Sequence, residues 1–168
     1  MRELLQLVPT VLDPRGRCNR KGLLIIASLM LAIEVVLGVA VWGLGMSFTG
    51  TPTTLFKLLF CWLAICACSK RLHDIGLGAG ILGWGLLATI VWTLVVGLAV
   101  ALGLGIEQLM PSGRWYVAAM AISMLPVVLA MLWLHLAKGQ VGTNAYGAEP
   151  TGLGFSIMAY QPAGVRLT

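Results

Sequence analysis

The sequence predicts an all-α integral membrane protein that crosses a bilayer four times and keeps both termini on the cytoplasmic side. Three observations carry this prediction: the composition, four apolar stretches, and the placement of Lys and Arg. Of the 168 residues, 59% are hydrophobic and 10% are charged, and the mean hydropathy is +0.94. A soluble domain carries about 25% charged residues, which it needs to cover its core. The composition therefore indicates that lipid surrounds most of this chain.

The four apolar stretches are each near or above the ~17 to 25 residues that span ~30 Å of hydrocarbon. They are residues 23–46, 52–68, 77–105 and 116–137. The second is the weakest, because it reaches membrane length only if Lys57 lies in the membrane or extends its ammonium group toward the surface. We find no tandem or inverted repeat and treat residues 1–168 as a single membrane domain.

A short apolar patch, residues 4–12, precedes the first span and is interrupted by Pro9. It is too short to cross a bilayer, so we expect residues 1–21 to be cytoplasmic, with this patch lying in the membrane interface. The first span is too long for the apolar core of a signal peptide, and no small-residue cleavage site follows it. We therefore expect that span to remain in the mature protein.

Orientation follows from the basic residues, of which nine lie on one side of the predicted spans and two on the other. The nine are Arg2, Arg15, Arg17, Arg20, Lys21, Lys70, Arg71, Lys138 and Arg166, and the two are Arg114 and Lys57. The positive-inside rule then places the N-terminus, the loop between the second and third spans, and the tail 138–168 in the cytoplasm. This explains the net charge of +5 better than nucleic-acid binding, which would need a basic stripe with interleaved aromatics.

The four cysteines do not indicate a disulfide framework, since Cys18 is predicted to be cytoplasmic and the other three lie in one apolar run. Cys66 and Cys68 are two residues apart and so lie on different faces of a helix, which is a poor arrangement for binding a metal. We interpret the cysteines as small packing residues and expect no metal site and no cofactor.

Two ionisable residues fall inside the predicted spans. Glu34 is thirteen residues beyond Lys21, and Lys57 is thirteen before Lys70, so both lie ~20 Å from the cytoplasmic side. Antiparallel neighbouring helices would bring them level, and a lone carboxylate in lipid costs several kcal/mol. We hypothesise a Glu34–Lys57 ion pair. The functional alternative makes Glu34 a proton or cation site in a small transporter.

The third span carries small residues at every fourth position, which lets two helix backbones approach closely. This helix-packing seam consists of Gly85, Thr89, Thr93, Gly97, Ala101 and Gly105. Packing within a four-helix bundle is the first interpretation, and a homodimer face is the second. In the fourth span, Pro126 deprives the Ile122 carbonyl of its helical partner and predicts a kink, with Ser123 near enough to help solvate that carbonyl.

Three polar clusters lie on the predicted cytoplasmic side: residues 15–21 (Arg-Gly-Arg-Cys-Asn-Arg-Lys), 70–74 (Lys-Arg-Leu-His-Asp) and 142–150 (Gly-Thr-Asn-Ala-Tyr-Gly-Ala-Glu-Pro). In order and spacing they resemble the domain of unknown function 805 family of small bacterial inner-membrane proteins, over most of the chain. That family shows Gly-Arg-x-x-Arg, Arg-Arg-Leu-His-Asp and Gly-x-Asn-Arg-Tyr-Gly-x-Asp-Pro in the corresponding places.

The departures from that pattern indicate a divergent member. Lys70 and Ala145 stand where the family has Arg, Glu149 stands where it has Asp, and residues 22–24 lack its aromatics. Ala79, Gly80 and Ile81 stand near where the family tends to carry Ser or Ala before paired Trp. The resemblance implies a bacterial inner-membrane location and a four-span architecture, and it implies no biochemical activity.

Opposite charges in these clusters suggest a structural latch between cytoplasmic loops, with Asn144 and Gly147 forming a tight turn. The residues assigned to this motif are Arg17, Arg20, Arg71, His73, Asp74, Asn144, Tyr146, Gly147 and Glu149. A second interpretation is that the basic residues bind anionic lipid headgroups or another membrane protein. Catalysis is not expected, because no nucleophile or third ligand accompanies His73 and Asp74. We expect an accessory membrane protein acting through its cytoplasmic face and binding no nucleic acid.

Overall fold

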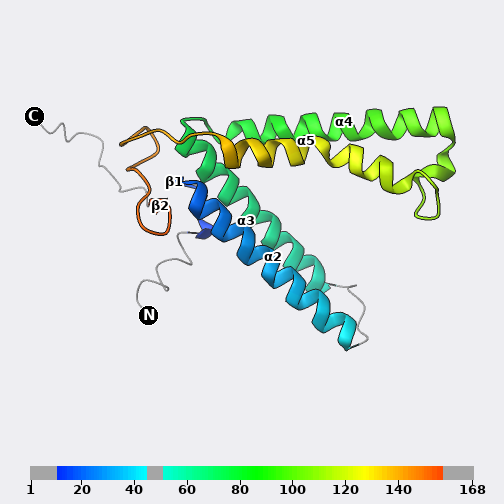
Figure 1. Ribbon diagram of the computed structural model, residues 1–168, viewed down its shortest axis with the longest axis horizontal. Coiled ribbons are helices and arrows are strands. Elements are labelled where there is room, and N and C mark those ends of the chain that lie inside the picture. Colours follow the sequence, from blue (N-terminus) through cyan, green and yellow to red (C-terminus); the bar gives the residue numbers. More distant parts are fainter. Residues whose placement is uncertain (1–10, 45–50, 157–168) are drawn as a thin grey trace, which may run out of the picture. The chain divides into compact units, whose positions relative to one another are not determined.

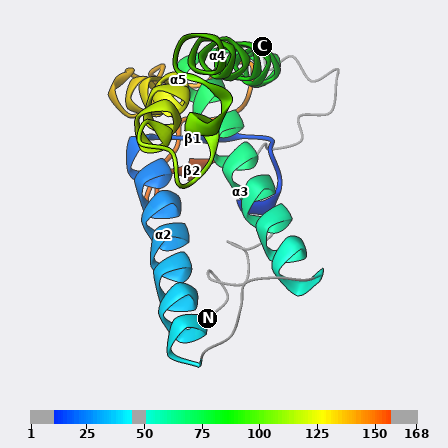
Figure 2. The same cartoon turned by 90° about the vertical axis from the view of Figure 1, so that its right-hand side faces the viewer.

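The computed structural model describes residues 11–44 and 51–156 (Figures 1 and 2). The elements within them are β1 (Arg17–Cys18), α2 (Arg20–Gly43), α3 (Thr51–Ile75), α4 (Gly80–Leu104), the 3-10 helix η1 (Ile106–Leu109), α5 (Tyr116–Leu136) and β2 (Phe155–Ser156). In the described part of the chain, α2, α4 and α5 are long and apolar enough to cross a membrane. These helices indicate a multi-pass membrane protein.

The described residues form two units. The first comprises those up to Ala79 and those from Ala137 onward, and the second comprises Gly80–Leu136. In the first unit, α2 and α3 run antiparallel to one another, and the two short strands lie at one end of this pair (Figures 1 and 2). The strands pair antiparallel, with Arg17 opposite Ser156 and Cys18 opposite Phe155.

Helix α2 begins three residues before the predicted span because of its N-cap. The Asn19 side-chain oxygen accepts a hydrogen bond from the Gly22 amide at 3.0 Å, which satisfies one of the amides that a helix start leaves without an intrahelical partner. The buried residues of α2 are Gly22, Leu23 and Ile26, all in its first two turns. Most of its other apolar residues are exposed, as expected for a helix in contact with lipid.

The C-terminal end of α3 corrects one sequence prediction. The second span was expected to end at residue 68, with Lys70–Asp74 in a loop, but the helix continues to Ile75. Gly76, with φ of +91°, then closes it: the Gly76 amide bonds the His73 carbonyl at 3.1 Å and the Leu77 amide bonds the Leu72 carbonyl at 2.8 Å. This Schellman pattern terminates helices at a glycine in the left-handed region. The polar motif therefore stands on the last helical turns rather than in a flexible loop.

The chain before β1 lies against α3. The Leu12 carbonyl accepts hydrogen bonds from the Trp62 indole nitrogen at 3.0 Å and from the Cys66 thiol at 3.2 Å. Only Val11 and Leu12 of the predicted interfacial patch are described, and residues 4–10 lie outside the described part of the chain. This contact leads the N-terminal segment past α3 before it enters β1.

In the second unit α4 packs against α5 (Figure 1). The carbonyl that the helical proline leaves without a helical donor accepts a hydrogen bond from the neighbouring helix. The Trp92 indole nitrogen of α4 donates to the Ile122 carbonyl at 2.9 Å, which is the carbonyl that Pro126 leaves without a helical donor. The sequence had suggested Ser123 as the residue that helps to solvate this carbonyl. Trp92 supplies the hydrogen bond from the neighbouring helix instead.

The helix-packing seam lies only partly against α5. Thr93 and Gly97 line a cavity of about 200 Å³ together with Ala119 and Ser123 of α5. A Cβ added at Gly85 or at Gly97 would meet no atom within 4 Å, so the packing of this unit does not require either position to be glycine. Gly105, with φ of +99°, follows the end of α4 and caps η1.

Candidate functional site

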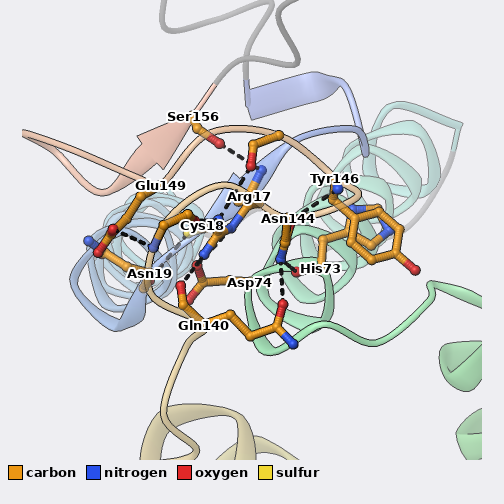
Figure 3. A network of polar contacts seen from close by, with 12 residues as sticks. Arg17, Cys18, Asn19, His73, Asp74, Gln140, Asn144, Tyr146, Glu149 and Ser156 are labelled. Atoms are coloured by element: carbon orange, nitrogen blue, oxygen red, sulfur yellow. Dashed lines mark hydrogen bonds and ion pairs between the residues drawn. The ribbon is translucent and has the colours of Figure 1, made fainter. Parts of the chain in front are cut away.

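Polar side chains from three separated segments of the first unit meet at one end of α2 and α3 (Figure 3). The segments are β1, the last turns of α3, and the chain after α5. Arg17 and Arg71 are both 0% exposed, and Asp74 is 3% exposed. We call these three residues the latch. Buried charges of this kind need partners, because taking them out of water costs several kcal/mol per ion.

Arg17 uses every nitrogen of its guanidinium group. Nε and Nη2 donate to Asp74 Oδ1 at 3.2 and 3.0 Å. Nη1 donates to the carbonyls of Gly142 and Gly147, and Nη2 also donates to that of Gln140. Arg17 therefore joins β1 to α3 and to the chain after α5 at once, with the planar geometry that guanidinium offers to several acceptors.

Arg71 takes the other oxygen of the same carboxylate. Its Nη1 donates to Asp74 Oδ2 and its Nη2 donates to the Ala137 carbonyl. Burial lowers the pKa of the Arg71 guanidinium, and the neighbouring Asp74 carboxylate opposes that shift. The spacing of three residues on one helix brings Arg71 and Asp74 together. One carboxylate thus bridges two buried cations, and removing it would leave both without a counter-charge.

A tight turn covers the end of α3. The Asn144 side-chain oxygen accepts from the Tyr146 amide at 2.9 Å, and its amide nitrogen donates to the His73 carbonyl at 2.9 Å. The backbones of Asn144 and Gly147 exchange two hydrogen bonds of 3.1 Å. The Glu149 carboxylate accepts from the Gly142 amide at 2.7 Å. The turn therefore satisfies a carbonyl at the helix terminus and is closed by its own side chains.

His73 holds the same turn from the side. Its Nδ1–H donates to the Gly16 carbonyl at 3.0 Å, and its ring stacks on that of Tyr146 with centroids 4.1 Å apart and planes inclined by 3°. Burial lowers the pKa of His73, and the hydrogen bond to Gly16 opposes this. The geometry suits a neutral imidazole that packs as an aromatic ring.

Several residues of this site were not singled out in the sequence. Gln140 and Ser156 accept hydrogen bonds from Arg17, and a Cβ added at Gly139 would overlap the Asp74 carboxylate. Cys18 is fully buried beside the latch, and burial raises the pKa of its thiol to about 12. Asn19, which caps α2, is a residue that sequence can signal, because Asn is favoured directly before an apolar helix.

A cavity of about 480 Å³ opens beside the latch, and we call it the basic cavity. Its lining residues come from the start of α2, the end of α3 and the chain after α5. They are Asn19, Arg20, Lys21, Arg71, Asp74, Gly139, Gln140, Glu149, Pro150 and Gly152. The Nε of Arg20 donates to the Ala137 carbonyl at 3.0 Å, so Arg20 and Arg71 share one carbonyl acceptor.

The two ionisable residues that the sequence predicts to lie in the membrane line a common cavity. Glu34 and Lys57 line a space of about 530 Å³ between α2 and α3, whose other walls are apolar. Both ion pairs within residues 11–44 and 51–156 involve Asp74, so a direct Glu34–Lys57 ion pair stays a prediction. The described residues contain no group of three or more His, Cys, Asp or Glu side chains that could hold a metal ion.

Comparison with known proteins adds no relative to this picture. No protein-family model matches the chain, and no curated protein or solved structure is significantly similar to it. What the molecule does has to be argued from its own residues.

Proposed function

We propose that this chain is a bacterial inner-membrane protein with four spans, both termini in the cytoplasm, and an accessory rather than catalytic role. In this proposal it is a divergent relative of the domain of unknown function 805 family. The latch is the single observation that carries the proposal, because it makes one structured face from three segments that lie far apart in the chain.

The latch favours α3 as the fourth membrane span. Helix α2 begins at the latch, and α3 ends there. If α2 crosses the bilayer, α3 has to cross it in the opposite direction to bring Asp74 back to Arg17. Lys57 is then accommodated within or at the edge of the membrane. The basic residues around the latch favour the cytoplasmic side for this end.

Labelling with a membrane-impermeant maleimide tests the orientation. Cysteines introduced singly at Ser112 and at Ala148, both exposed, are compared with the wild-type background in intact spheroplasts and in inverted vesicles. We expect the Ser112 position to react in spheroplasts and the Ala148 position to react only in inverted vesicles. Reaction of both on the same side would contradict the proposed topology.

An accessory role requires a surface that contacts other components, and the chain after α5 offers one. Val141 is 91% exposed and Leu153 is 57% exposed, on a segment that the latch holds in place. Single exposed apolar residues are common on any surface, so their use has to be tested. The proposal is that this face contacts another membrane component, with a second copy of the chain as one form of it.

Photo-crosslinking in cells makes this testable. A photoreactive amino acid at Val141 should give one discrete cross-linked product, whose mass distinguishes a second copy from another protein. The product should disappear when Asp74→Asn opens the latch and should persist with Glu34→Gln. Absence of any discrete product at Val141 and Leu153 would contradict an accessory role through this face.

One observation favours the alternative of a small transporter or ion-coupled carrier. Glu34 and Lys57 face a common cavity of about 530 Å³ between α2 and α3, and intramembrane ionisable residues mark ion pathways in many transporters. The alternative predicts that Glu34→Gln abolishes a proton or cation flux into proteoliposomes without changing the melting temperature. The accessory role predicts no such flux in the wild-type protein.

A further inference from the structure

We propose that the basic cavity binds a phosphate group, as carried by the headgroup of an anionic phospholipid. The proposed orientation is needed only to identify a membrane lipid as the source of the phosphate. The binding chemistry follows from the cavity itself.

Charge is the first argument. Three basic side chains and two acidic side chains line the cavity, an excess of one positive charge. Arg17 approaches the same Asp74 carboxylate from outside the lining, which raises the local excess to two. The acidic groups are already engaged: Asp74 lies between two guanidinium groups, and Glu149 accepts a hydrogen bond from the Gly142 amide. An anion entering the cavity would therefore meet a positive field.

The position of the two lining arginines is the second argument. Arg20 and Arg71 both donate to the Ala137 carbonyl, and burial together with the charge of Arg20 lowers the pKa of Arg71. Like charges gathered at one neutral acceptor repel each other, and an anion bound at the exposed Arg20 would relieve the repulsion. Phosphate oxygens fit this arrangement, since guanidinium groups bind them through paired, charge-assisted hydrogen bonds.

The start of α2 adds to the same field. The cavity includes Asn19, Arg20 and Lys21, the N-cap and first two residues of a helix of 24 residues. A helix N-terminus presents the positive end of its dipole to an anion. In the proposed topology this end of α2 lies where the helix leaves the hydrocarbon, which is the level of the lipid phosphates.

The volume suits a headgroup rather than a bare ion alone. About 480 Å³ lies within the ~300 to 1,000 Å³ range of small-molecule sites. A phosphate at Arg20 and Lys21 leaves space for a glycerol or similar polar substituent against Gly139, Gln140 and Gly152. These residues offer backbone and amide groups rather than apolar surface.

Lipid titration with native mass spectrometry tests the inference on detergent-purified protein. The test variant is the double substitution Arg20→Gln and Lys21→Gln, which removes two exposed charges from the cavity and leaves the latch intact. The matched control is Arg15→Gln with Lys138→Gln, two exposed charges of the same unit that do not line the cavity. Melting temperatures without added lipid establish that both variants are folded.

We expect wild type and control to bind one phosphatidylglycerol more tightly than phosphatidylcholine. The cavity variant should bind that phosphatidylglycerol about tenfold or more weakly, since each cation near an anionic surface contributes ~1 kcal/mol. Inorganic phosphate is the competitor. If it displaces the lipid, soluble phosphates are included in the ligand class. If it does not, the site is one for a lipid headgroup, and both outcomes support a phosphate site.

Equal weakening in the cavity variant and the control would show that diffuse surface charge does the binding, and would overturn the inference. Equal affinity of the wild-type protein for phosphatidylglycerol and phosphatidylcholine would show that the net negative charge of the headgroup is not recognised, and would overturn the assignment to an anionic phospholipid. Neither result depends on which side of the membrane the cavity faces, so a failure here is distinct from a failure of the maleimide test of topology.

Discussion

Replacing Asp74 by Asn removes the one carboxylate that lies between two guanidinium groups with no access to water. Arg17 and Arg71 are each 0% exposed, so neither charge can be solvated without opening the latch. Breaking a buried ion pair by removing one partner costs about 3 to 5 kcal/mol. Asn keeps the size and one acceptor oxygen, while its NH₂ group faces a cation where the second oxygen stood. We therefore expect the latch to lose about 3 kcal/mol or more.

Cys18 provides a local assay for this loss. It is fully buried in β1, next to Arg17, and burial raises the pKa of its thiol to about 12, so it should react with a thiol reagent only when the latch opens. A loss of 3 kcal/mol raises the open population by about 150-fold, and the labelling rate of Cys18, followed by peptide mass spectrometry, should rise accordingly. Glu107→Gln, an exposed acid in the second unit, is the control and should leave the rate unchanged.

A small effect would refute this reasoning. If Asp74→Asn raises the Cys18 labelling rate by less than about fivefold, the loss is below about 1 kcal/mol, as for an exposed pair. The carboxylate would then not be the element that keeps the two arginines in place, and the latch would depend on the backbone hydrogen bonds of Arg17 instead.

Three further predictions test other contacts. Burial holds the pKa of His73 below its ordinary 6.5. As the pH falls, the imidazole is therefore protonated in the unfolded chain before it is protonated in the folded protein. The free energy of unfolding should therefore fall as the pH drops below about 6.5, and His73→Gln should flatten this dependence in thermal melts. Trp92→Phe removes the hydrogen bond to the carbonyl beside the helical proline and should lower stability by about 1 kcal/mol, measured by circular dichroism. Gly139→Ala places a methyl group on the latch carboxylate and should accelerate Cys18 labelling, whereas Gly80→Ala, with open space around it, should not.

Much of the helical architecture could be predicted because long apolar runs have few alternatives in lipid. The predicted spans at residues 23–46, 77–105 and 116–137 correspond to α2, α4 and α5 within a few residues, and length and hydropathy suffice for that. The prediction of a loop at Lys70–Asp74 was wrong because these residues, taken by themselves, have the polar character of a loop. Tertiary partners of Arg71 and Asp74, which lie far away in the chain, make the helical form favourable there.

Parts of the site were open to sequence reasoning and others were not. Opposite charges in three clusters suggested contact between Arg17, Arg71 and Asp74, and these side chains do meet. The carbonyl acceptors of Ala137 and Gln140 belong to the backbone. Every residue has such a carbonyl, so the residue type does not indicate which one accepts a hydrogen bond. The Trp92 hydrogen bond was hidden for a related reason, since it depends on the rotation of α4 relative to α5.

The central claim is that the chain after α5 folds back onto the segment before α2 on one side of the membrane. Phe155 lies opposite Cys18 in the paired strands, so Phe155→Cys with the native Cys18 should form an intrachain disulfide under mild oxidation in membrane vesicles. Leu153→Cys, which is exposed and outside the strand, should cross-link far more slowly. Equal rates at the two positions would contradict the account.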